Sequence, residues 1–278
     1  MFRTRFRNEI LAEFLPSARA RKKQQLIILC DGMPSIPRKQ PLAEFIARKG
    51  FWVLYPRYRG AWESDGEFLA RPPHEDILDI LGELSGEVEE MAFGQKFRLD
   101  PDRIFVIGGS FGGAASILLS LDPRVKRVVA NCPVVDWSIL DEAEKAETSK
   151  GNYAEYIRQA FGKAYRLSDA NWRKLRAGDF YNPWHHRNEI DGSKVLMFHA
   201  KDDPNVPYER TREFAEITGS KLNSLNSGGH ISTDYITRKY WTEIKKFFDS
   251  AVGGQAARAS ARASYSRSDS NGSKTHIV

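Results

Sequence analysis

The chain has 278 residues, of which 41% are hydrophobic and 28% charged, so it carries enough apolar material for a buried core and wholesale disorder is excluded. Its 42 Lys and Arg exceed its 36 Asp and Glu, which gives a net charge of +6. The excess lies at the two ends, because residues 1–25 hold seven basic and two acidic side chains and residues 251–278 hold four and one. The slightly acidic middle argues against a folded nucleic-acid-binding surface.

The two cysteines, Cys30 and Cys132, stand far apart in apolar surroundings, and no Cys-x-x-Cys or Cys/His ligand spacing occurs. We therefore expect neither a metal site nor a cofactor. No apolar run approaches the ~18 residues of a membrane helix, and the Arg-rich N-terminus lacks the apolar segment of a secretory signal. These features predict a cytoplasmic protein without a membrane partner, and they leave the oligomeric state open.

Apolar runs predict the strands. Residues 2–6 alternate with period two and residues 10–15 form a second short segment, which predicts two exposed edge strands. Continuous apolar runs are typical of strands buried on both faces of a mostly parallel sheet. They lie at residues 25–30, 51–55, 103–107, 125–130 and 195–200, with a shorter one near 222–225.

Helical periodicity fills the intervals between these runs. It predicts helices at residues 41–48, 75–91, 111–121, 208–218 and 234–248. In the second of these, Ile77, Ile80, Leu81, Leu84 and Val88 share one face, and in the last, Ile236, Tyr240, Ile244 and Phe247 form the inner face. Strands that alternate with helices predict a doubly wound α/β domain with helices on both faces of the sheet.

Residues 136–187 break this rhythm, because they are rich in charge, Trp and Tyr and show helical pieces near 141–147, 153–165 and 170–175. Insertions at the carboxyl side of such sheets commonly cover a site. We expect one α/β domain over residues 1–250, with a small helical cap at about 136–187, and a disordered Ala/Arg/Ser-rich tail at 251–278.

The most informative motif is Gly108-Gly109-Ser110-Phe111-Gly112-Gly113, which directly follows a predicted strand and precedes a helix of small residues. It fits the Gly-x-Ser-x-Gly turn, in which glycines allow a strained serine to point outward between strand and helix. A triphosphate-binding loop is excluded because the motif contains no Lys followed by Ser or Thr, and a dinucleotide loop because Ser110 replaces its second Gly. The alternative is that the turn is purely structural and that Ser110 takes no part in a reaction. We predict that Ser110 is a nucleophile.

A serine nucleophile needs a histidine base, and this turn requires the order Ser, acid, His along the chain. His276 lies in the tail, and His185 and His186 leave no upstream loop for an acid. His199 lies within a predicted strand, where we expect a packed ring. His230 follows two glycines in a loop before the last helix, so we predict that it is the base.

Two aspartates compete for the role of acid. Asp202 and Asp203 both follow the strand at 195–200 and precede a helix, and their positions do not choose between them.

The oxyanion of an acyl-transfer intermediate needs two backbone N–H donors. One is the amide of Phe111, which follows the nucleophile. The other comes from a loop after an earlier strand, where Gly32 lets the chain approach the serine and makes the amide of Met33 the predicted second donor. Trp62, Trp137 and Trp184 are predicted to wall an apolar acyl or aryl pocket.

Five short stretches are similar to the motifs of a known family and occur in the same order along the chain. They are residues 31–34, 55–60, 100–113, 199–207 and 229–230. The chain resembles the catalytic domain of the prolyl oligopeptidase family, with dienelactone-hydrolase-like esterases as near relatives. The resemblance covers residues 26–250 and implies an α/β-hydrolase fold.

The resemblance also implies site roles. It selects Asp203, three residues before Val206, as the acid, and it implies His230 as base with Met33 and Phe111 as oxyanion donors. Asp31 stands where the family usually has His, which puts an extra carboxylate near the oxyanion loop. The residues before Leu26 are too few for the β-propeller that restricts access in the family's peptidases.

Together these features predict a serine hydrolase that cleaves a carboxylic ester of a small substrate through an acyl-enzyme intermediate. The alternative is a serine peptidase or acylaminoacyl hydrolase that takes short peptides. A second alternative, suggested by Asp31 and the basic ends, is a non-catalytic binding protein on the same fold.

Overall fold

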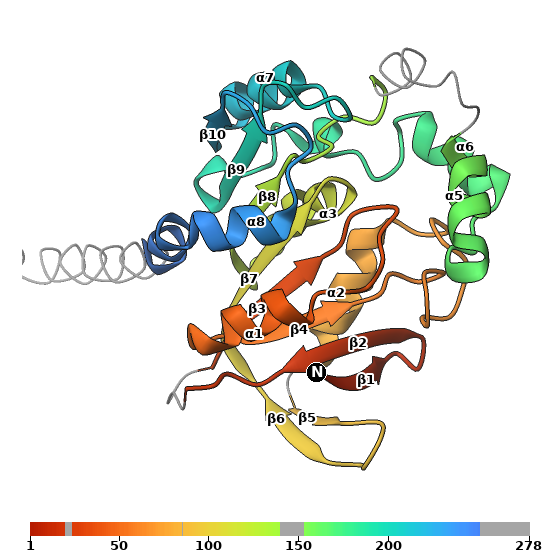
Figure 1. Ribbon diagram of the computed structural model, residues 1–278, viewed down its shortest axis with the longest axis vertical. Helices are drawn as coiled ribbons and strands as arrows, with labels where there is room; N and C mark the ends of the chain where they lie inside the picture. The colour runs from red at the N-terminus through yellow and green to blue at the C-terminus, as the bar shows by residue number, and fades with distance from the viewer. Residues whose placement is uncertain (20–23, 85, 140–152, 251–278) are drawn as a thin grey trace, which may run out of the picture.

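The computed structural model describes residues 1–19, 24–84, 86–139 and 153–250. The strands of its main sheet are β1 (Phe2–Phe6), β2 (Ile10–Leu15), β3 (Gln24–Cys30), β4 (Trp52–Pro56), β7 (Pro101–Gly109), β8 (Val125–Asn131), β9 (Val195–Ala200) and β10 (Lys221–Leu225). They lie in the order β1-β2-β4-β3-β7-β8-β9-β10 (Figure 1). The pairs β1–β2 and β2–β4 are antiparallel, and every pair from β4 onward is parallel.

The helices are α1 (Gln40–Arg48), α2 (Pro73–Glu83), α3 (Phe111–Leu119), α5 (Tyr153–Phe161), α6 (Asp169–Arg176), α7 (Tyr208–Thr218) and α8 (Thr233–Lys239), and residues 241–250 are also helical. Short 3₁₀ turns are η1 (Gly162–Ala164), η2 (Pro183–His186) and η3 (Gly192–Lys194), and a separate hairpin joins β5 (Gly86–Glu89) to β6 (Lys96–Leu99). None of these described helices is long and apolar enough to cross a membrane.

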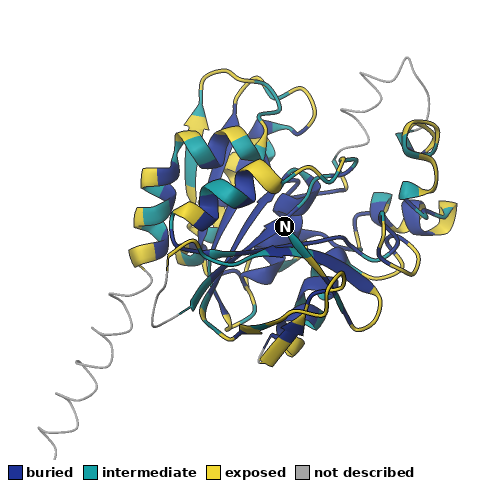
Figure 2. Cartoon of the chain, turned by 60° about the horizontal axis from the view of Figure 1, so that its bottom comes forward, coloured by how far each residue is buried: buried dark blue, intermediate teal, exposed yellow. Residues whose placement is uncertain are grey.

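The core lies on both faces of the sheet, because successive side chains of a strand point to opposite sides. Ile27 and Leu29 of β3 pack with α1, α8 and residues 241–250, whereas Leu26 and Ile28 pack with α2, α3 and α7. Figure 2 shows the buried residues gathered in the sheet and along the helix faces that touch it. The doubly wound α/β architecture predicted from the apolar runs is therefore confirmed.

The predicted helix at 75–91 is wrong beyond its first half. The helix α2 ends at Glu83, and residues 86–89 form β5 of the separate hairpin. Val88 is buried there between the exposed Glu87 and Glu89, which is the period-two pattern of a strand. Leu84 and Val88 lie four residues apart, a spacing that fits the helical period as well as the strand period of two. The hydrophobic pattern alone therefore predicted a helix that is too long.

Two further expectations need correction. β2 is not an edge strand, because it lies between β1 and β4 and its residues 10–12 are buried on both faces. In the last helical segment Ile236 and Ile244 face the core as predicted, but the helix is interrupted at Tyr240. Trp241 and Phe248 are therefore buried where Tyr240 and Phe247 were expected.

The helices α5 and α6 lie beside the main sheet, where the cap was predicted (Figure 1). The segment between α5 and α6 docks against the rest of the protein, because it forms bridges from Tyr165 to Ala61 and from Leu167 to Phe68. The helical piece predicted at 141–147 and the tail at 251–278 lie outside the described residues.

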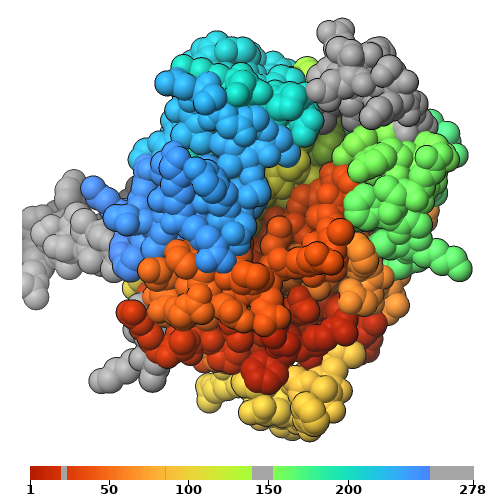
Figure 3. Space-filling view, in the orientation of Figure 1, coloured from red at the N-terminus to blue at the C-terminus, as the bar shows by residue number. Residues whose placement is uncertain are grey.

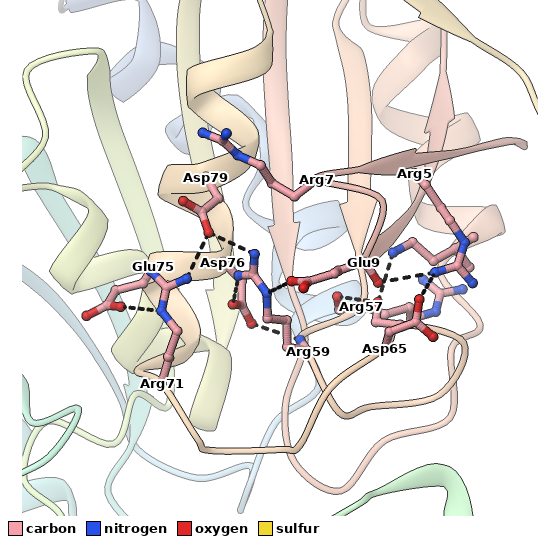
Figure 4. A network of polar contacts seen from close by, with 12 residues as sticks. Arg5, Arg7, Glu9, Arg57, Arg59, Asp65, Arg71, Glu75, Asp76 and Asp79 are labelled. Carbon is pink, nitrogen blue, oxygen red and sulfur yellow. Dashed lines mark hydrogen bonds and ion pairs between the residues drawn. The ribbon is translucent and has the colours of Figure 1, made fainter.

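A polar network fixes the loop on which this segment docks (Figure 4). The guanidinium of Arg59 is 2.5 Å from Asp76, 2.6 Å from Glu9 and 2.9 Å from Asp79, so it joins the turn after β1 to α2. Burial raises the pKa of Asp76, although its bonds with Arg59 oppose the rise. Arg71 pairs with Glu75 and Asp79 at the exposed end of the same network.

Replacing Arg59 by Met should destabilise the fold by about 3–5 kcal/mol, because it leaves the carboxylate of Asp76 buried without its ion-pair partner. Arg71→Met is the matched control. The Arg71 side chain is 48% exposed against 12% for Arg59, so its loss should cost less than ~1 kcal/mol. Urea unfolding measures both free energies, and equal losses would contradict this assignment.

Candidate active site

The site begins at Ser110, which lies between β7 and α3 with φ 54° and ψ −120°. A positive φ is strained for serine and persists only where the surrounding structure enforces it. A Cβ on Gly108 would lie 2.1 Å from the carbonyl oxygen of Gly112, and one on Gly112 would lie 2.3 Å from that of Cys30. The glycines are required because β7, α3 and the end of β3 meet here.

The loop after β3 lies against this turn. A Cβ built on Gly32 would be 3.7 Å from the Cβ of Ser110. The Gly32 amide donates to Asp31 (3.0 Å) and the Ser35 amide donates to the hydroxyl of Tyr165 (2.9 Å), while Pro34 has no N–H. Within residues 32–35 only the Met33 amide lacks an acceptor among the described residues.

The second predicted donor is Phe111, the first residue of α3. The first amides of a helix have no acceptor within it. The amides of Met33 and Phe111 therefore both lack a described acceptor near the turn that carries Ser110, and their role as oxyanion donors stays a prediction.

The predicted base and acid are in contact. His230 Nδ1 lies 2.9 Å from Asp203 Oδ2, whose side chain has no exposed area. A carboxylate only accepts, so Nδ1 carries the hydrogen and Nε2 is left to take a proton. Oδ2 also accepts from His199 Nε2 (3.1 Å), and Oδ1 accepts the amides of Asn205 (2.9 Å) and Val206 (3.1 Å).

These bonds set the charge of the acid. Burial alone would raise the pKa of Asp203, but the hydrogen bonds from His199 and His230 outweigh it and hold the pKa well below its usual range. Asp203 is therefore a buried, ionised carboxylate whose contact with Nδ1 is suited to orienting the ring of His230.

Asp202 has a different role from its neighbour. Its two carboxylate oxygens accept the amides of Gly228 (3.2 Å) and Gly229 (2.9 Å), and these bonds lower its pKa. Asp202 thus shapes the loop that carries His230, and Asp203 contacts the imidazole itself. The structure separates two aspartates that position along the chain left equivalent.

The histidine loop is tied to the nucleophile turn by Asn131, at the end of β8. Its carbonyl oxygen accepts the amide of Ser110 (2.8 Å), and its side-chain nitrogen donates to the carbonyl of Ile231 (2.5 Å). Thr233 packs so tightly that a Cβ on Gly109 would lie 1.9 Å from its hydroxyl. Segments more than a hundred residues apart in the sequence therefore converge at one place.

Sequence reasoning missed the roles of His199, Asn131 and Asp202. His199 is buried, as predicted, but its ring also donates to the acid. Its spacing of four residues from Asp203 across a strand end was the available signal. The contact of Asn131 depends on tertiary structure and left no local pattern.

Cys132 lies beside this pair, with its sulfur among ligand-type atoms of Asp203 and His230 that are within 4.8 Å of one another. Burial raises the pKa of the Cys132 thiol to about 12, and the nearby Asp203 adds to the rise. The sulfur is therefore a neutral thiol at physiological pH, which is the unreactive form.

The three predicted tryptophans lie in different surroundings. Trp62 donates from its indole nitrogen to the carbonyl of Ser35 (3.0 Å), so it borders the oxyanion loop. Trp137 is buried with its ring 5.7 Å from that of Phe111. Trp184 packs under the guanidinium of Arg210, 3.4 Å away, on the side of α7. The pocket role of Trp62, Trp137 and Trp184 stays a prediction.

The cap side contributes Tyr153, whose hydroxyl donates to the carbonyl of Met33 (3.3 Å). Figure 3 shows the molecular surface hollowed between α8 and α5. An aromatic boundary on the cap side of the oxyanion loop suits an apolar group of a substrate.

Comparison with known proteins agrees with this geometry. Residues 40–253 match the prolyl oligopeptidase family. The chain belongs to the prolyl oligopeptidase family. The family match and the arrangement around Ser110 together support a serine hydrolase.

The fold is similar to that of solved α/β-hydrolases. An esterase of Pyrococcus furiosus superposes with a TM-score of 0.66 at 18% identity, over 89% of this chain and 88% of that one. The acylaminoacyl peptidase of Pyrococcus horikoshii gives a TM-score of 0.60 at 15% identity, over 88% of this chain and 40% of that one. These likenesses confirm the α/β-hydrolase fold.

A curated relative is the quorum-quenching protein AidA of Acinetobacter baumannii, which is 27% identical over 115 residues. The match covers 40% of this chain and only 36% of the length of that relative.

The two aspartates provide a direct test of the site. Asp203→Asn removes the charge that orients His230 and should lower kcat by about three to four orders of magnitude. Asp202→Asn keeps the acceptor of the imidazole and should lower kcat less than ~10-fold, because it weakens only two amide hydrogen bonds. Steady-state kinetics with circular dichroism as a folding control compares them, and equal losses would contradict the assignment.

The pH profile tests the ionisation of the acid. Since the pKa of Asp203 is depressed, this carboxylate stays ionised over the acid side of the profile. A single protonation then inactivates the enzyme, and log(kcat/KM) should fall with a slope of about 1 on the acid side. A slope of about 2 would show that Asp203 takes up a proton in the same range.

Proposed function

We propose that the protein is a serine hydrolase that cleaves a carboxylic ester of a small substrate through an acyl-enzyme intermediate. The observation that carries the proposal is the strained Ser110, flanked by two available amides and joined through Asn131 to the loop of the His230–Asp203 pair. A passive turn needs neither the strain nor the hydrogen-bonded His230–Asp203 pair.

Each residue of the candidate site has its own role in the reaction. The Ser110 oxygen attacks the substrate carbonyl while His230 Nε2 takes its proton, and Asp203 stabilises the resulting imidazolium. The amides of Met33 and Phe111 bind the oxyanion as it forms. His230 then protonates the departing alcohol, and water repeats the sequence to release the acid and regenerate Ser110.

Ester hydrolysis is favoured over amide hydrolysis because an alcohol leaves with less assistance from a proton than an amine does. The aromatic side chains of Trp62 and Tyr153 beside the oxyanion loop support an apolar or aryl group in the substrate. The family match favours a second candidate, hydrolysis of short peptides or acylaminoacyl groups.

The buried free thiols of Cys30 and Cys132 support a cytoplasmic location.

Labelling with a fluorophosphonate tests the function. The wild type should label and Ser110→Ala should not, because the probe needs an activated serine. Turnover of aryl esters of graded acyl length, compared with aminoacyl anilides, then separates the two candidate substrates, and we expect the esters to react faster. Absence of label on the wild type would instead favour the non-catalytic binding protein.

A further inference from the structure

Asp31 brings a negative charge to the loop where an oxyanion would form. It directly precedes Gly32, the residue that approaches Ser110, and its side chain is only 12% exposed. A carboxylate at this place opposes the developing oxyanion unless another charge compensates it. The structure shows how this charge is held.

Four donors converge on the carboxylate. Its Oδ1 accepts the amide of Gly32 (3.0 Å) and pairs with Lys39 Nζ (3.1 Å), while Oδ2 accepts the hydroxyls of Ser35 (2.7 Å) and Tyr55. The donors come from the loop itself, from the residue before α1, and from β4. A buried charge is stable only when it is paired and hydrogen-bonded in this way.

This arrangement determines which amide is free. The carboxylate occupies the Gly32 amide, and its bond to the Ser35 hydroxyl closes the loop around Pro34. The Ser35 amide is turned to Tyr165. The Met33 amide is left as the available donor, because Asp31 occupies the Gly32 amide, Pro34 has no N–H and Tyr165 accepts the Ser35 amide.

Lys39 determines how strongly the charge of Asp31 disfavours an oxyanion at this loop. Its ammonium is 24% exposed and lies against Oδ1, so the pair is nearly neutral as a unit. Without Lys39 the carboxylate would keep its place through Tyr55, Ser35 and Gly32 but would act on the oxyanion as an unbalanced charge.

We propose that Asp31 and Lys39 form a positioning pair for the oxyanion loop, in which the carboxylate fixes the Met33 amide and the ammonium cancels the carboxylate's charge. Neither residue touches the reacting atoms. The inference rests on the proposed hydrolase function and concerns how this chain reaches it with Asp at this position.

The test is a charge-rescue experiment on the full chain with an aryl ester. Lys39→Met should lower kcat about tenfold with KM changed less than ~2-fold, because the uncompensated carboxylate acts on the transition state. Adding Asp31→Asn to Lys39→Met should restore most of kcat, since Asn keeps the shape without the charge. Asp31→Ala should lower kcat about 100-fold, because the loop loses its anchor.

The matched control is the exposed ion pair of Lys245 and Asp249, whose Lys→Met and Asp→Asn variants should match the wild type. If Lys39→Met and the double variant show the same kcat, or if only KM changes, the pair does not position the oxyanion loop. Should Asp31→Ala fail to fold, the comparison of Lys39→Met with the double variant still decides. An unlabelled, inactive wild type overturns the proposed function as well, whereas an active wild type with unaffected variants overturns only this inference.

Discussion

The first turn of α3 lies directly against the backbone at the end of β3, and the rest of the site depends on this close approach. A side chain at Gly112 would collide with the carbonyl oxygens of Cys30 and Asp31. Because the two segments touch backbone to backbone, Phe111 and Met33 lie on neighbouring segments beside Ser110. The positive φ of Ser110 follows from the same contact, since the chain must turn sharply from β7 into α3.

Three carboxylates hold the loops of the candidate site, and each is bound by its own set of donors. Asp203 accepts four hydrogen bonds and carries the buried charge that the imidazole requires. Asp202 holds two glycine amides of the histidine loop. Asp31 holds the oxyanion loop beside Lys39. Negative charge is tolerated at a site that must stabilise an anion because each carboxylate is fixed by local N–H, O–H or ammonium groups.

The sequence was sufficient where the physical constraint is local. The glycines around Ser110 and the continuous apolar runs of β3 and β9 predicted the nucleophile turn and the parallel sheet. The sequence was not sufficient where one pattern fits two kinds of secondary structure, or where a contact joins residues that are far apart in the chain. Leu84 and Val88 fit a helix as well as a strand, and Asp202 and Asp203 differ only in where a folded loop points them. Asn131 and His199 act through tertiary contacts that no local pattern encodes.

The most direct measurement of the central claim is a crystal structure of the covalent adduct that an alkyl phosphonate forms with this protein. We expect phosphorus bonded to the Ser110 oxygen, with one phosphonyl oxygen about 3 Å from both the Met33 and Phe111 nitrogens. An adduct whose phosphonyl oxygen contacts neither amide, or one formed on another residue, would contradict it.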